Sequence, residues 1–357
     1  MLIYIFFLLI CLICSSTNWK NGNQQNKLSS FLLGFLLLNI ALFRDYTVGN
    51  DVIQYCSHYL ESTNNLQDIS TNMYEYGYRY LLAFCKSLNI ELRQYFFIVN
   101  IIIFIPLIWY IKTYSLNVAY SLFLYVTIGS FEFNFTGLRQ SMSIGIILTA
   151  LLWTSKMSNQ FKKTLFLIIG IYIASTIHYS AQFCYIIPII LLFRRIRVTY
   201  TKWLLLIPFI VLFLGNIIML IVENLIVIRY SSYLDEDISN KNWIYYFAIP
   251  YSFLLFITYL LNKRIKTEYI TDKATLFGYL STLLYNILAF TSNTLPMLNR
   301  LSTYFHLFVI IFISNEITNI TNVRLKRISY IGITLLCLIY FLVTIPNTSI
   351  ANYKLYF

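Results

Sequence analysis

Charged residues are scarce in this sequence, and their scarcity excludes an ordinary soluble protein. Asp, Glu, Lys and Arg make up 11 % of the 357 residues, whereas soluble globular domains average about 25 %. Hydrophobic residues make up 59 % and gather in long runs separated by short polar breaks. A helix of about 20 apolar residues crosses a bilayer core roughly 30 Å thick. The sequence therefore predicts an all-α, polytopic membrane helix bundle that forms a single domain over residues 1–357.

Glycine and proline are also few, with 11 and 6 residues scattered along the chain. The polar breaks contain no glycine-rich phosphate-binding loop and no kinase-like set of motifs, which disfavours a nucleotide-driven pump. Matching interrupted helices in two halves, which many transporters have, are also absent. No zinc-binding spacing is present, so we expect neither a metal nor a cofactor.

The six cysteines do not define a metal or redox motif. Cys11 and Cys14 have C-x-x-C spacing, but they lie inside the first apolar run. Cys56 and Cys85 share one polar stretch, where a disulfide can form if that stretch is extracytoplasmic. The sequence leaves this disulfide open.

Twelve apolar runs are candidate spans, although several are short enough to leave ten or eleven possible. They lie roughly at 1–15, 28–43, 95–111, 116–130, 138–154, 164–178, 180–193, 203–222, 243–262, 274–292, 298–314 and 328–345. The first run lacks the basic segment and the small-residue cleavage site of a signal peptide. We therefore expect it to be a retained first helix.

The distribution of charge predicts the orientation of these spans. When the polar breaks are taken alternately, one set contains 17 of the 26 basic residues and three of the 14 acidic residues. Lys and Arg are retained on the cytoplasmic side, so both termini are predicted to be extracytoplasmic. Arg194-Arg195-Ile196-Arg197 is the densest basic group. It suits anionic membrane lipid, and the net charge of +12 requires no nucleic-acid partner.

The longest polar stretch, about 44–94, falls on the extracytoplasmic side in this alternation. A loop of this length between membrane helices usually covers a site or contains an amphipathic or re-entrant helix. It carries several candidate site residues, namely Arg44, Asp51, Tyr55 and Glu75. Residues 76–90 are amphipathic enough to lie on the membrane surface.

Further costly polar residues lie at the outer ends of the predicted helices. They are Arg139 and Gln140 at the start of the fifth span, His178 at a tight external turn, and Arg300, Tyr304 and His306 in the eleventh span. A charge at the centre of a membrane helix costs about 2.5–3.5 kcal/mol on insertion scales and less near the interface. A single arginine of this kind is often only an anchor, but several on one side predict a shared site.

The types of these side chains indicate one chemistry. Guanidinium groups bind phosphate in a bidentate manner, so Arg44, Arg139 and Arg300 suit a pyrophosphate at the membrane surface. Asp51, Glu75 and the histidines are candidates for removing a proton from a sugar hydroxyl. Tyrosines of the long loop provide stacking faces and hydroxyls for sugars.

An ordered series of short motifs resembles the EpsG-type branch of Wzy-like polysaccharide polymerases. The series runs through Arg44, Val48-Gly49-Asn50-Asp51, Tyr55, Glu75-Tyr76-Gly77-Tyr78, Gly137-Leu138-Arg139-Gln140, His178-Tyr179-Ser180 and Arg300-Leu301-Ser302-Thr303-Tyr304-Phe305. One departure is Asn50, where the family more often has Thr. The resemblance covers about residues 40–310.

This resemblance implies a bacterial plasma-membrane enzyme that polymerises polyprenyl-pyrophosphate-linked oligosaccharide repeat units into O-antigen, capsule or exopolysaccharide. Flippase and chain-length regulator proteins are the implied protein partners. We expect a metal-independent, inverting glycosyl transfer in which His178, or else Asp51, is the base. Arg139 and Arg300 would neutralise the leaving pyrophosphate, while Arg44, Glu75, Tyr55, Gln140, Tyr304 and His306 would bind substrate.

Two alternatives remain open at this stage. One is another membrane glycosyltransferase or ligase that uses a lipid-linked sugar, with Asp51 or Glu75 as the base and a metal as a possible aid. The other is a flippase or transporter of lipid-linked oligosaccharide. Products of single addition would favour the first, and movement of lipid-linked sugar without a change in its length would favour the second.

Overall fold

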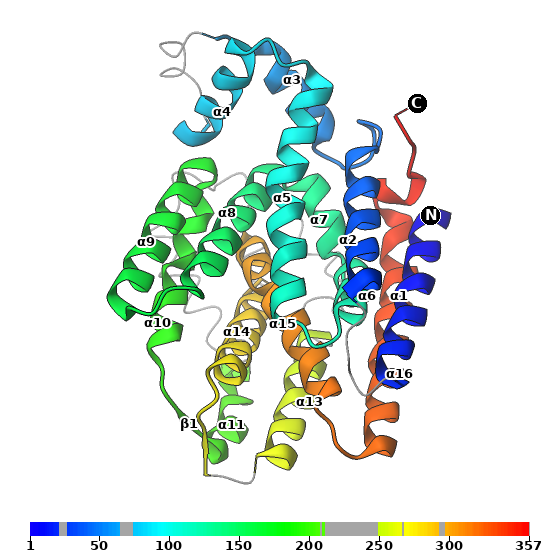
Figure 1. Cartoon of the computed structure of the whole chain (residues 1–357), viewed down its shortest axis with the longest axis vertical. Coiled ribbons are helices and arrows are strands. Elements are labelled where there is room, and N and C mark those ends of the chain that lie inside the picture. Colours follow the sequence, from blue (N-terminus) through cyan, green and yellow to red (C-terminus); the bar gives the residue numbers. More distant parts are fainter. Residues whose placement is uncertain are drawn as a thin grey trace. The chain divides into compact units, whose positions relative to one another are not determined.

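The computed structural model of the chain is almost entirely helical (Figure 1). It describes residues 1–20, 27–64, 74–207, 209–210, 249–265, 268–292 and 297–356. The chain forms two compact units: Met1–Pro188 with Arg327–Phe357, and Ile189–Lys326. The helical, apolar architecture confirms an all-α polytopic membrane protein.

Seven longer helices build the first unit. They are α1 (Leu2–Lys20), α2 (Lys27–Leu42), α5 (Leu92–Tyr114), α6 (Val118–Thr127), α8 (Leu138–Thr154), α9 (Gln160–Ile177) and most of α16 (Val323–Thr344). Helix α5 packs against α8, and α8 packs against α9 (Figure 1). Gly145 permits the first contact, because a Cβ there would lie 2.3 Å from the backbone oxygen of Ile102. Small residues at helix crossings are typical of membrane bundles.

Where the structure describes the predicted extracytoplasmic stretch, it contains two short amphipathic helices, α3 (Val52–Glu61) and α4 (Tyr76–Ser87). The Tyr59 ring of α3 stacks on the Tyr95 ring of α5, with the ring centroids 4.4 Å apart. Gly77 lets α4 approach α9, because a Cβ at Gly77 would lie 2.2 Å from Thr176 Oγ1. These contacts hold the amphipathic helices against the ends of the long ones. Cys56 and Cys85 are free thiols.

A sharp break separates α7 (Ser130–Thr136) from α8, with an angle of 119° between the two helices. The turn lies at Gly137, between the two helices. The bend directs the first turn of α8 away from the axis of α7. The sequence predicted ordinary spans at 116–130 and 138–154, but α6, α7 and α8 divide this region into three helices.

In its described residues, the second unit contains a two-stranded ribbon and three long helices. Strand β1 (Ile196–Arg197) pairs antiparallel with β2 (Tyr269–Ile270), and α11 (Val198–Leu204) follows β1. The long helices are α13 (Ile249–Arg264), α14 (Lys273–Thr291) and α15 (Met297–Thr318). Arg264 Nη2 lies 3.0 Å from Oε1 of the buried Glu316, which joins α13 to α15.

The predicted spans agree with the observed helices over most of the described chain. Among the described helices, five are long and apolar enough to cross a membrane, namely α5, α9, α14, α15 and α16, and α7 with α8 passes the same test as one bent span. Shorter apolar helices cover Leu2–Thr17, Lys27–Leu42, Val118–Thr127 and Tyr179–Leu192. The predicted span 180–193 begins as a 3₁₀ helix, η2 (Tyr179–Tyr185), before α10 (Ile186–Leu192). Most of span 203–222 and the start of 243–262 lie outside the described residues.

The C-terminal segment packs onto the start of the predicted outer loop. After η6 (Ile345–Asn347) and η7 (Ser349–Asn352), Leu355 forms an antiparallel bridge with Arg44. The Asp45 N–H donates to the Lys354 carbonyl at 2.9 Å. The chain that opens the loop is therefore held between α2 and residues far away in the sequence.

Candidate functional site

Glu75 joins Arg139 and His178 in the first unit. Glu75 precedes α4, Arg139 lies in the first turn of α8, and His178 follows the last residue of α9. Arg139 Nη1 forms an ion pair with Glu75 Oε2, and His178 Nδ1 lies 3.3 Å from Glu75 Oε1. Three segments therefore place an acid, a guanidinium and an imidazole at one point.

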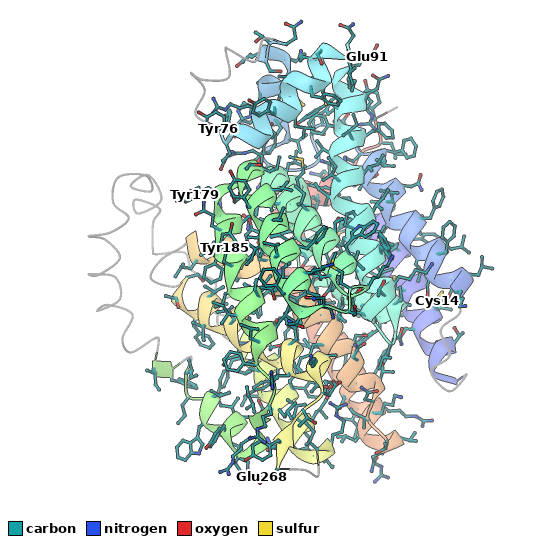
Figure 2. All side chains as sticks on the ribbon, turned by 60° about the vertical axis from the view of Figure 1, so that its left-hand side comes forward. Cys14, Tyr76, Glu91, Tyr179, Tyr185 and Glu268 are labelled. Atoms are coloured by element: carbon teal, nitrogen blue, oxygen red, sulfur yellow. The ribbon has the colours of Figure 1, made fainter. Side chains whose placement is uncertain are left out.

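A backbone hydrogen bond completes the surroundings of the Glu75 carboxylate. The Tyr179 N–H donates to Glu75 Oε1 at 3.0 Å, where η2 begins beside the start of α4. Figure 2 shows Tyr76 of α4 facing the segment that contains Tyr179. The His178 ring is at ion-pair distance, but its Nδ1 is not aligned for a hydrogen bond. The short 3₁₀ segment after α9 thus presents both a ring and an N–H to one carboxylate.

The charge state of Glu75 follows from these neighbours. Burial raises its pKa, but His178, the Arg139 charge and the Tyr179 N–H together outweigh burial and lower the pKa to about 2. Interactions that favour the charged form of a carboxyl group have this effect. Glu75 is therefore a carboxylate at neutral pH. This charged carboxylate pairs with Arg139 and lies at ion-pair distance from His178.

Aromatic rings surround the Arg139 guanidinium. Its Cζ lies 4.8 Å from the ring centroid of Tyr74 and 5.5 Å from that of Tyr78. The Tyr55 hydroxyl is hydrogen-bonded to Arg139. Arg139 Nε is buried and has no hydrogen-bond partner among the described residues. Stacked rings fix the plane of a guanidinium, so the orientation of Arg139 is set before any ligand binds.

His58 and Tyr74 form a second pair in the same cluster. His58 Nε2 contacts the Tyr74 hydroxyl, and the two ring centroids are 4.3 Å apart. Burial, together with the Arg139 charge, lowers the pKa of His58. His58 was one of the histidines predicted to be able to remove a proton, but the sequence assigned no site role to His58, Tyr74 or Tyr78 individually. The three-residue spacing of Tyr55 and His58, which places both on one face of α3, is the signal that could have grouped His58 with the site.

Asp51 lies close to this cluster, immediately before α3. Its negative charge acts on the Tyr55 hydroxyl, and its side chain is half-exposed. Within the described ranges, the Asp51 carboxylate has no hydrogen-bond or ion-pair partner. It is therefore the less constrained of the two predicted bases.

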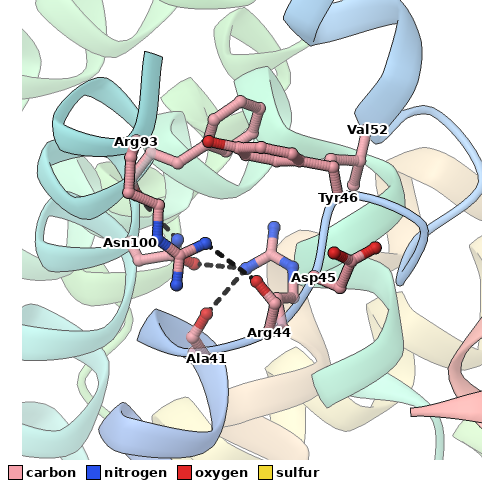
Figure 3. A pocket seen from close by; sticks show the side chains of 8 residues that line it. Ala41, Arg44, Asp45, Tyr46, Val52, Arg93 and Asn100 are labelled. Atoms are coloured by element: carbon pink, nitrogen blue, oxygen red, sulfur yellow. Dashed lines mark hydrogen bonds between the residues drawn. The ribbon is translucent and has the colours of Figure 1, made fainter. Parts of the chain in front are cut away.

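Arg44 is enclosed behind the start of the loop (Figure 3). Its Nη1 donates to Asn100 Oδ1 at 2.8 Å and to the Ala41 carbonyl at 3.0 Å. Its Cζ lies 4.1 Å from the ring centroid of Phe135. Arg93 flanks it and donates to the Arg44 carbonyl at 2.9 Å. These bonds hold the loop, and Nη2 is the one nitrogen of Arg44 without a protein partner in the described chain.

The remaining predicted site residues are divided between the first and the second unit. Gln140 is buried on α8 next to Arg139. Arg300, Tyr304 and His306 lie on α15 of the second unit, where Arg300 is exposed and Tyr304 is buried. The His306 ring makes an edge contact with Tyr285, at 4.9 Å between the ring centroids. The grouping of Arg300 with Arg139 stays a prediction.

Comparison with known proteins adds one finding. The model of the EpsG family matches residues 27–356 of this chain, which is nearly its whole length. No curated protein and no solved structure matches the chain.

Proposed function

The chain belongs to the EpsG family of Wzy-like polysaccharide polymerases, and we propose that it joins polyprenyl-pyrophosphate-linked oligosaccharide repeat units. In this proposal the reaction takes place on the outer face of the bacterial plasma membrane, with both termini on that side. The substrates are supplied by a flippase, and chain-length regulator proteins act on the product. O-antigen, capsule and exopolysaccharide are the possible products.

The observation that supports the proposal most directly is the Glu75 carboxylate between Arg139 and His178. A carboxylate that faces one nitrogen of an imidazole orients the other nitrogen for proton transfer. With His178 Nδ1 toward Glu75, Nε2 is the nitrogen that accepts a proton. The same carboxylate places a guanidinium beside that base, as a glycosyl transfer with an anionic leaving group requires.

The proposed step is a single inverting displacement. The acceptor hydroxyl oxygen attacks the anomeric carbon of the donor glycan, and His178 Nε2 takes the hydroxyl proton. The bond between the anomeric carbon and the pyrophosphate oxygen breaks, and its electron pair leaves with the lipid pyrophosphate. Arg139 binds the charge that develops on this leaving group, so the proposal needs no metal. Preorganised positive charge of this kind is usually the largest catalytic contribution.

A set of substitutions tests the assignment. His178→Ala is expected to lower the polymerisation rate about 100-fold or more, and Arg139→Ala about 100- to 1,000-fold. Lys162→Ala, which removes an exposed charge from the other end of α9, is the matched control and leaves polymer length unchanged. The readout is the size distribution of glycan made by purified protein from lipid-linked repeat units. Long polymer from both His178→Ala and Arg139→Ala contradicts the proposal.

Asp51 is the alternative base, and the same assay separates the two. If His178 is the base, Asp51→Asn retains most of the rate. Loss of long chains with single repeat units retained, after deletion of the gene, identifies polymerisation. Accumulation of single-addition products indicates another lipid-linked glycosyltransferase, and transfer of lipid-linked sugar across the membrane without elongation indicates a transporter.

A further inference from the structure

Arg79 is a buried guanidinium that no carboxylate neutralises among the residues that the structure describes. It lies on α4, and only 7 % of its surface is exposed. Its Nε and Nη1 are buried and have no hydrogen-bond partner, and no carboxylate pairs with it in the parts of the chain that the structure describes. The Tyr76 ring lies over the guanidinium, with its centroid 4.4 Å from Arg79 Cζ.

Such an arrangement is unfavourable in the free protein. Buried charges are normally paired or hydrogen-bonded, because removal from water is otherwise not compensated. Arg79 is also close to the surface, since the Tyr76 ring over it is 63 % exposed. An anion that displaces this ring reaches the N–H groups of Nε and Nη1, which have no partner in the described chain, and hydrogen bonds from a guanidinium to phosphate are strengthened by the charges of both groups.

Arg79 lies on the same helix that Glu75 precedes, close in sequence to the Glu75–Arg139–His178 cluster. The Arg79 N–H donates to the Glu75 carbonyl at 3.2 Å, so Arg79 lies one helical turn after the residue that holds Arg139. One turn of a helix advances about 5.4 Å along its axis. This distance is comparable with the length of a diphosphate group. An anion at Arg79 therefore lies on the same helix as Tyr76, one turn after Glu75, the residue that pairs with Arg139.

An apolar stripe on the surface of α4 begins at Tyr76, the residue whose ring lies over Arg79. Tyr76, Tyr80, Phe84 and Leu88 follow one another at four-residue spacing, and each is 53–63 % exposed. Residues four apart lie on one face of a helix, and 12 residues extend about 18 Å. The stripe therefore leads away from Arg79 as a continuous apolar surface that no other described segment covers.

We propose that α4 binds the isoprenoid diphosphate part of the lipid-linked donor, with Arg79 on the diphosphate and the stripe on the first isoprene units. This inference rests on the proposed function and names the lipid part of its substrate. The bilayer alone accounts for an exposed apolar stripe, but it leaves the free guanidinium donors unexplained. A molecule with a diphosphate at one end and an isoprenoid chain at the other matches both features.

The test uses the purified full-length protein in detergent with geranylgeranyl diphosphate as the probe. Binding is measured directly and by the rise in Tm. Arg79→Met, which keeps the apolar stem, is expected to weaken binding about tenfold or more. The double change Phe84→Ser with Leu88→Ser weakens binding of this probe but not of inorganic diphosphate. Lys86→Ala, a charge removal on the same helix, is the control and binds as the wild type does.

The Tm without ligand distinguishes a binding role from a structural one. Because Arg79 has no charged partner in the described chain, Arg79→Met is expected to have a Tm equal to or above that of the wild type. A clear fall in the Tm of the free variant, or unchanged binding by it, overturns the inference. Unchanged binding by the Phe84/Leu88 variant also overturns it, because the stripe is then a contact with bulk lipid.

Two further probes identify what is recognised. Geranylgeraniol, which lacks the diphosphate, and phosphatidylglycerol, which carries a single phosphodiester, are expected to bind more weakly than geranylgeranyl diphosphate. Equal binding of phosphatidylglycerol assigns the surface to a phospholipid headgroup and overturns the inference. These binding results do not depend on polymerisation. Arg79-dependent binding together with unaltered polymer from His178→Ala contradicts the proposed function and leaves the binding site intact.

Discussion

Glu75 Oε1 lies 3.3 Å from Nδ1 of His178, although Glu75 precedes α4, His178 follows α9, and the two residues lie far apart in the sequence. Because the other oxygen of the same carboxylate pairs with Arg139, removal of one negative charge disturbs both partners. This relationship leads to predictions about activity, stability and topology.

Glu75→Gln is expected to lower the polymerisation rate about tenfold or more, because a charged hydrogen-bond partner is lost while the shape is kept. The informative comparison is the double variant with His178→Ala. If Glu75 acts by orienting His178, the double variant is no slower than His178→Ala alone. Additive losses in the rate of glycan elongation indicate that Glu75 acts independently of this histidine.

Stability at low pH is expected to depend on Glu75. The pKa of about 2 in the folded protein lies below the ordinary value of 4.5, so the folded state binds the proton less tightly than the unfolded state. Glu75 therefore stabilises the fold above about pH 4.5, and its contribution is lost as the pH falls toward 2. The Tm difference between wild type and Glu75→Gln should shrink between pH 6 and pH 3. A constant difference would argue against this charge effect.

Gly77→Ala is expected to displace α4 from α9. The added Cβ would lie 2.2 Å from Thr176 Oγ1 and 2.9 Å from the Thr176 backbone carbon, and the backbone has little room to move. Overpacking of this kind costs about 1–3 kcal/mol, and it would also separate Glu75 from His178. Gly332→Ala is the control, because nothing lies within 4 Å of its added Cβ. Thermal unfolding and polymer size measure the two effects, and equal behaviour of both variants contradicts the prediction.

The ring of Tyr74 and the hydroxyl of Tyr74 are expected to contribute separately to the rate of glycan elongation. Tyr74→Phe keeps the ring beside Arg139 and removes the contact with His58, whereas Tyr74→Ala removes both. If the stacked ring sets the plane of the Arg139 guanidinium, Tyr74→Ala lowers the elongation rate more than Tyr74→Phe does. Rates that fall equally in the two variants would assign the effect to the hydroxyl.

Labelling of introduced cysteines tests the shared side of Arg139, His178 and Arg300. Tyr179 is 47 % exposed beside His178, and Arg300 is exposed on α15. Tyr179→Cys and Arg300→Cys, each in a background without the native cysteines, are both expected to react with a membrane-impermeant maleimide on intact cells. Lys202→Cys, in a predicted cytoplasmic segment, serves as the unreactive control. Reaction at only one of the first two positions would exclude a common site.

The hydrophobic pattern alone determined much of the membrane architecture. Apolar runs long enough to cross a bilayer predicted α5, α14, α15 and α16 within a few residues, because an isolated helix must satisfy its own backbone in lipid. The amphipathic stretch at 76–90 likewise predicted α4. The residue types of Glu75, Arg139 and His178 marked them as candidates, since charges are costly near membrane helices.

The tertiary structure decided which of these residues meet and how. The sequence did not predict that Glu75 joins Arg139 to His178, because the contact depends on the 119° bend before α8 and on the 3₁₀ turn after α9. Nor did it distinguish Arg44, bonded to Asn100 and Ala41, from Arg79, which has no charged partner in the described chain. A hydrophobic run specifies that a segment is buried in lipid, whereas the direction of a side chain is specified only by the helices packed around it.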